Sequence, residues 1–102
     1  MENTPEAISG LQNAIRKLHN VDSDYLESVP ILEKFGNKTV WQGLVYVFRL
    51  KGHPQSDKCY VWYSDNTETG KRKYYAVLHI PPIDSPEKAV RASIVHDYRS
   101  QG

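Results

Sequence analysis

The chain has 102 residues, of which 39% are hydrophobic and 25% charged. A chain of this length holds one compact core, so we expect residues 1–102 to form a single domain. Its 13 basic and 12 acidic residues give a formal net charge of +1. Such a balance excludes a strong overall field for nucleic acid or anionic membranes, so any binding of that kind must come from a local patch.

The cysteine content and the first residues indicate the cellular compartment in which we expect the protein. The single cysteine, Cys59, cannot form an internal disulfide, and the opening residues lack the basic start and apolar run of a secretory signal. No stretch approaches the roughly 20 apolar residues that span a bilayer. We therefore expect a cytoplasmic protein that does not insert into a membrane.

The first segment has the signature of an amphipathic helix. Thr4 and Pro5 provide a hydroxyl N-cap followed by a proline at the first helical position. Apolar residues then recur at spacings of three and four, and the pattern ends near His19 and Asn20. The recurring residues are Ile8, Leu11, Ile15 and Leu18. The polar cluster Asp22-Ser23-Asp24 predicts a short turn before Pro30.

Four stretches between residues 29 and 80 are rich in β-branched and aromatic residues and are separated by polar or glycine-containing turns. They are Val29 to Phe35, Thr39 to Lys51, Lys58 to Ser64 and Lys71 to Ile80. The second stretch is apolar on both alternating faces, which indicates a central strand. Short connections between consecutive strands predict an antiparallel meander.

The last segment repeats the helix start of the first, with Ser85 as N-cap and Pro86 behind it. Val90, Ile94 and Tyr98 then recur every four residues, so this helix also has one apolar side. The expected fold is a two-layer α+β sandwich of order αββββα, with both helices on one face of the sheet. The opposite face would then be open to water, to a partner or to a ligand.

The leading functional hypothesis is a small non-enzymatic interaction module that forms a homodimer through this open face. Apolar and aromatic residues on both faces of the strands exceed what one small core can hide. Aromatic side chains supply large contact area at protein interfaces. The residues expected at the contact surface are Trp41, Tyr60, Trp62 and Tyr75.

A first alternative is binding of RNA or single-stranded DNA. Aromatic rings between cations suit this role, because bases stack on the rings while Lys and Arg contact phosphates. Ordinary strand composition explains the same residues, since lysine on an outer strand also blocks edge pairing. The cations of this alternative are Lys58, Lys71, Arg72 and Lys73.

A second alternative is an enzyme or ligand carrier with a pocket between sheet and helices, and with His53 or His79 at its mouth. The four histidines and Cys59 do not occur at zinc-ligand spacing, and we expect neither a metal nor a cofactor. Cys59 lies within a predicted strand, where a thiol usually behaves as a small buried hydrophobe.

Overall fold

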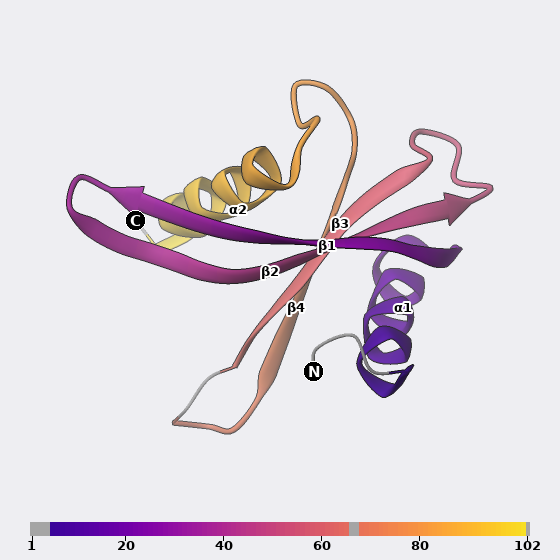
Figure 1. Cartoon of the computed structure of the whole chain (residues 1–102), viewed down its shortest axis with the longest axis horizontal. Helices are drawn as coiled ribbons and strands as arrows, with labels where there is room; N and C mark the ends of the chain where they lie inside the picture. Colours follow the sequence, from indigo (N-terminus) through magenta and orange to yellow (C-terminus); the bar gives the residue numbers. More distant parts are fainter. Residues whose placement is uncertain (1–4, 66–67, 102) are drawn as a thin grey trace.

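The computed structural model describes the backbone of residues 5–65 and 68–101, and their side chains except at 5, 35 and 97–101. The expected order αββββα is confirmed (Figure 1). The elements are α1 (Pro5–His19), β1 (Asp22–Phe35), β2 (Lys38–Lys51), β3 (Lys58–Asp65), β4 (Arg72–Leu78) and α2 (Pro86–Gln101). The predicted cap at Thr4 and the side chain of Tyr98 lie outside the described part of the chain.

The four strands form one antiparallel sheet in the order β1-β2-β3-β4, so the predicted meander is confirmed. β1 begins at Asp22, where the polar cluster predicted a turn; that prediction is wrong. The strand starts early because β2 continues as far as Lys51, which pairs with Asp22. Tyr25 also packs its ring against Phe48, with 5.8 Å between centroids.

Backbone and side-chain hydrogen bonds mark the end of α1 and the start of α2. Asn20 follows α1 with a φ of 58°, and its N–H donates to the carbonyl of Arg16 at 2.8 Å. Ser85 caps α2, because its Oγ accepts from the N–H of Lys88 at 3.2 Å. No helix within residues 5–65 and 68–101 is long and apolar enough to cross a membrane.

One face of the sheet, here called the α1 face, is covered in part by α1. Successive strand residues point to opposite faces, and the even-numbered residues of β2 from 44 to 50 point to this one. Leu11 and Ile15 of α1 are fully buried against it. The buried strand residues of this cluster are Tyr46, Phe48, Leu50, Cys59 and Val61.

The other face, here called the α2 face, packs against α2. Ala89 and Val90 of that helix are fully buried in a second cluster. The buried strand residues of that cluster are Ile31, Val45, Val47, Tyr60 and Trp62. The expectation that both helices share one face is therefore corrected: each face receives one helix. The reason is that β2 and β3 carry large apolar side chains on both faces, so each face needs a cover.

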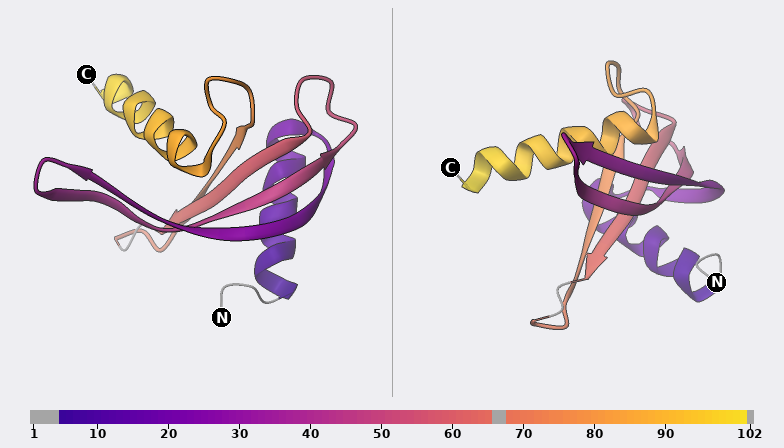
Figure 2. Two further views of the ribbon diagram at one scale, coloured as in Figure 1. Left: turned by 45° about the horizontal axis from the view of Figure 1, so that its top comes forward. Right: turned by 60° about the vertical axis from the view of Figure 1, so that its left-hand side comes forward.

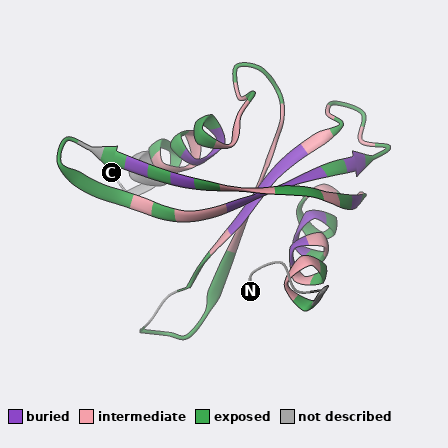
Figure 3. Cartoon of the chain, in the orientation of Figure 1, coloured by how far each residue is buried: buried purple, intermediate pink, exposed green. Residues whose placement is uncertain are grey.

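The sheet is continuous only near its middle. β2 and β3 pair over the short stretch in which Tyr46 is opposite Val61 and Arg49 is opposite Lys58. Beyond this stretch, here called the junction, the β1–β2 hairpin and the β3–β4 hairpin diverge (Figures 1 and 2). Buried residues gather where the strands cross, and the far ends of both hairpins are exposed (Figure 3). We call the wedge between the two diverging hairpins the fork.

Candidate functional site

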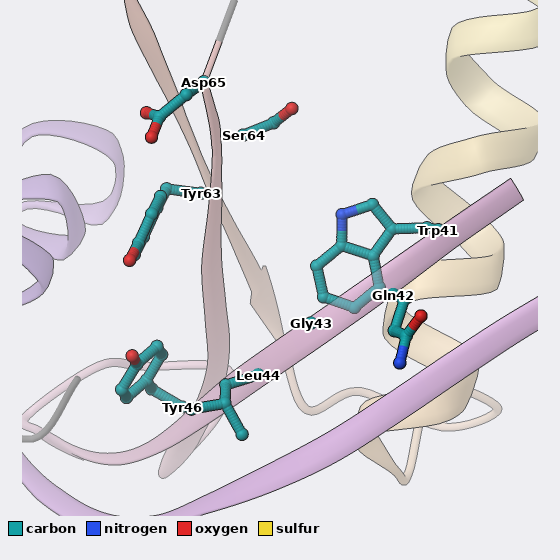
Figure 4. Close-up of a pocket in the computed structure, with 8 residues that line it drawn as sticks. All are labelled: Trp41, Gln42, Gly43, Leu44, Tyr46, Tyr63, Ser64 and Asp65. Carbon is teal, nitrogen blue, oxygen red and sulfur yellow. The ribbon is translucent and has the colours of Figure 1, made fainter. Parts of the chain in front are cut away.

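A cavity of about 370 Å³ occupies the fork, between the diverging parts of β2 and β3 (Figure 4). β2 supplies one wall and β3 supplies the other. The lining residues are Trp41, Gln42, Gly43, Leu44, Tyr46, Tyr63, Ser64 and Asp65. If the junction pairing continued, Leu44 would be opposite Tyr63 and Gln42 opposite Asp65. The cavity therefore takes the place of strand pairing that has stopped.

Trp41 lies along β2 over Gly43, as Figure 4 shows. A Cβ added to Gly43 would come within 2.9 Å of the indole, so only glycine leaves room for this ring position. The indole is also 6.2 Å from the ring of Trp62, measured between centroids. Glycine at position 43 thus allows Trp41 to cover this part of the cavity wall.

At the far rim of the cavity, Asp65 is held by Arg72. Arg72 donates from Nε and Nη2 to the two carboxylate oxygens, at 2.7 and 3.2 Å. Its guanidinium also lies 4.0 Å from the centroid of the Tyr63 ring. These hydrogen bonds hold the pKa of Asp65 below its ordinary value, and they raise the pKa of Arg72. Asp65 is therefore ionised at neutral pH, and its charge is balanced by Arg72.

The four residues expected at the contact surface come together on the α2 face. Trp62 stacks on Tyr75, with 5.2 Å between centroids and 6° between planes, and Trp41 adjoins Trp62. Tyr60 and Trp62, however, are only 2% and 3% exposed, because they pack in the cluster that α2 covers. Trp41 and Tyr75 are half-buried. Only these two retain surface that a partner could contact.

An exposed apolar surface on the α1 face was not predicted from the sequence. Leu32 is 49% exposed, and the adjacent Pro30 is exposed as well. Leu44 and Tyr63, which line the cavity, are half-buried and continue this surface across the fork. The alternation of Leu32 with the buried Ile31 was the available signal, but both residues are apolar and the pattern could not distinguish the two faces.

The four cations of the nucleic-acid alternative do not form one patch. Lys71, Arg72 and Lys73 are exposed at the far end of the β3–β4 hairpin. Lys58 lies at the junction end of β3, seven residues from Asp65, which corresponds to about 23 Å of extended strand. Lys73 places its Nζ 4.9 Å from the centroid of Tyr75. Binding of nucleic acid stays a prediction, carried by the first three cations alone.

His53 and His79 lie in different surroundings. The His53 ring meets that of His19, the last residue of α1, at 6.0 Å between centroids. His79 Nδ1 is 2.5 Å from the hydroxyl of Tyr60, whose pKa is raised by burial. Within residues 5–65 and 68–101, no group of three or more His, Cys, Asp or Glu could hold a metal ion.

Cys59 is fully buried in the junction. Burial raises the pKa of its thiol to about 12, so the nucleophilic thiolate is scarce at neutral pH. The thiol therefore has the properties of a core residue rather than of a nucleophile.

No protein-family model matches this chain, and no curated protein or solved structure is significantly similar to it. The fork, with its cavity and the exposed surface beside it, is the candidate functional site.

Proposed function

We propose that this chain is a small non-enzymatic interaction module, and that it forms a homodimer through the part of the α1 face that α1 leaves uncovered. The observation that carries the proposal is the exposed apolar surface of Leu32, continued by Leu44 and Tyr63. Full burial of an exposed leucine contributes about 1.5–3 kcal/mol, and burial of the 49% of Leu32 that is exposed contributes about half of that. One such surface on each chain suits a two-fold interface, which uses the same patch twice.

The arrangement of the two helices supports this choice of surface. On the α2 face, the aromatic residues Tyr60 and Trp62 are already buried within the chain. On the α1 face, α1 covers the junction, whereas Leu32 on the longer hairpin is left half-exposed. The α1 face beside the fork therefore offers accessible apolar area, and it does so on strands held by the rest of the sheet.

The test is the molar mass in solution, by size-exclusion chromatography with light scattering. We expect twice the 11.7 kDa of one chain, and we expect this mass to persist at high salt because the contact is apolar. Leu32→Asp places a charge in the contact and is expected to give a monomer. Leu18→Asp is the matched control, since Leu18 is 55% exposed on α1 and lies outside the proposed contact.

Two results would contradict the proposal. One is a wild-type chain that is monomeric at every concentration reached. The other is a dimer that Leu32→Asp leaves intact, because self-association would then use another surface. The absorbance spectrum of the eluted protein tests the nucleic-acid alternative in the same experiment, since bound nucleic acid would be released by salt.

A further inference from the structure

We propose that the β2 edge of the fork binds an extended, acidic segment of a partner protein by β-strand addition. In this mode a peptide adds to an open strand edge, and its main chain supplies the hydrogen bonds. The proposed site is the backbone edge of β2 inside the fork, and it adjoins the self-association surface at Leu44 and Tyr63. The proposal rests on the direction of backbone groups, on how the other strand edges are protected and on charge.

The backbone of β2 directs hydrogen-bonding groups into the fork. The N–H of Leu50 donates to the carbonyl of Asp57 at 2.8 Å, so the backbone N–H and C=O of Leu50 are directed toward β3. Along a strand, every second residue directs its N–H and C=O to the same edge. The backbone N–H and C=O groups of Leu44 and Gln42 are therefore directed to the same edge as those of Leu50. The pairing of β2 with β3, however, stops at Tyr46.

The β3 edge, on the other side of the fork, also directs backbone hydrogen-bonding groups into the fork. The carbonyl of Lys58 accepts from the N–H of His79 at 2.9 Å, so the backbone N–H and C=O of Lys58 are directed toward β4. By alternation, Tyr63 and Asp65 direct their backbone groups away from β4 and into the fork. No strand in the described part of the chain pairs with either of these facing edges. The β2 edge is the longer of the two, since β2 runs on to Lys38, although its register with β1 shifts at Val40.

The outer edges of the sheet differ from this inner edge. β1 carries Pro30, which has no N–H to donate, and its register shifts between Tyr25 and Glu27. β4 is short and has an exposed lysine, Lys73, near its start. Prolines, bulges and lysines are the features that prevent edges from pairing with other chains. Residues 41–45 of β2 contain neither proline nor lysine.

The charged side chains near the fork indicate which kind of partner segment would bind there. Exposed lysines stand at the far ends of both hairpins and outnumber the exposed carboxylate Glu68 there: Lys34 and Lys38 on one hairpin, Lys71 and Lys73 on the other. The rim carboxylate Asp65 is already neutralised by Arg72. An acidic segment is therefore attracted to the open end of the fork. Its apolar side chains would meet Leu44 and Tyr63 on the α1 face, or Trp41 on the α2 face.

The test uses a set of octapeptides, blocked at both ends, in which Val, Ile or Tyr alternates with Glu, and a matching set with Lys in place of Glu. Binding is measured by fluorescence anisotropy. We expect acidic peptides to bind at least about tenfold more tightly than their lysine counterparts. We also expect N-methylation of alternate peptide bonds on the edge-facing side to abolish binding.

Two variants separate the backbone of Gln42 from its side chain. Gln42→Pro removes the N–H that points into the fork and is expected to abolish binding. Gln42→Ala keeps that N–H and is expected to bind like the wild type. If Gln42→Pro fails to fold, amide exchange in the wild-type protein serves instead: the amides of Gln42 and Leu44 should exchange more slowly when peptide is bound.

The proposal is overturned if no acidic peptide of the set binds, if lysine peptides bind equally well, or if Gln42→Pro binds as tightly as Gln42→Ala. Peptide binding without slower exchange at Gln42 and Leu44 would also overturn it. Repeating the measurement with Leu32→Asp distinguishes the two proposals. Peptide binding by a monomeric variant supports strand addition whatever the outcome for self-association.

Discussion

The junction and the fork are built from the same two strands but have opposite properties. At the junction, β2 and β3 are hydrogen-bonded to each other and covered on both faces, so that Phe48 and Cys59 are fully buried. In the fork, the same strands separate around a cavity of about 370 Å³. The difference shows that strand composition alone does not make a continuous sheet. α1 covers the junction on one face, whereas α2 packs on Ile31 and pairs Arg91 with Glu33 beside the fork, where β2 and β3 have separated.

The largest expected difference between the two regions is in stability. Phe48→Ala should lower the free energy of unfolding by about 3–5 kcal/mol, because it leaves a cavity in the junction. Leu32→Ala, beside the fork, should change it by less than about 0.5 kcal/mol in the monomer. Urea denaturation of dilute protein measures both. Equal losses would mean that the fork is as well packed as the junction.

Thiol labelling compares access to the two regions. With its pKa raised to about 12, buried Cys59 should react at pH 8 at least about a thousandfold more slowly than a free thiol. A cysteine introduced by Ser64→Cys, in a Cys59→Ala background, should react nearly as fast as a free thiol because Ser64 is exposed. Rapid labelling of Cys59 in the folded protein would contradict a closed junction.

Substitution of Gly43 tests whether the position of the Trp41 indole in the cavity wall requires glycine. Gly43→Val should destabilise the protein by about 1–3 kcal/mol, because the new side chain displaces the Trp41 indole. In a Trp41→Ala background the same substitution should cost much less. Urea denaturation of the four proteins gives the coupling between the two positions. An equal cost in both backgrounds would show that Trp41 does not require the glycine.

The smallest expected effect is the pH dependence at the rim. Arg72 lowers the pKa of Asp65 in the folded protein, so ionised Asp65 stabilises the fold above its ordinary pKa, and this contribution is lost as pH falls through the lowered pKa. Asp65→Asn should therefore lower the urea midpoint slightly at pH 7 and not at pH 2. In an Arg72→Gln background the difference should disappear. A difference that grows toward acid would contradict this sign.

The order of the elements could be predicted because each has a strong local signal. Prolines begin both helices, and Gly36 and Gly70 adopt positive φ angles of 63° and 71° in the connections between strands. The start of β1 was missed because its first residues are polar. Ser23 is nevertheless buried there, while its neighbours Asp22 and Asp24 remain exposed. A small polar residue on the buried face conceals the alternation that identifies a strand.

The positions of the helices and of the site depend on packing that local patterns do not contain. Val47 and Phe48 are adjacent, apolar and buried on opposite faces, so alternation could not show which face each helix covers. Trp41 and Trp62 were predicted at one surface and do lie together, but the burial of Trp62 by α2 was not predictable. The fork was missed because residues on both sides of Tyr46 have the composition of a strand.

Amide hydrogen exchange along β2 in the free protein is the most direct test of the open edge on which the fork depends. Gly43 and Val45 pair with β1, and Tyr46 pairs with β3, so their amides should exchange slowly. Gln42 and Leu44, which point into the fork, should exchange at nearly the rate of an unstructured chain. Slow exchange at Gln42 and Leu44, matching that of Gly43 and Val45, would mean that the β2 edge is already closed and would contradict an open fork.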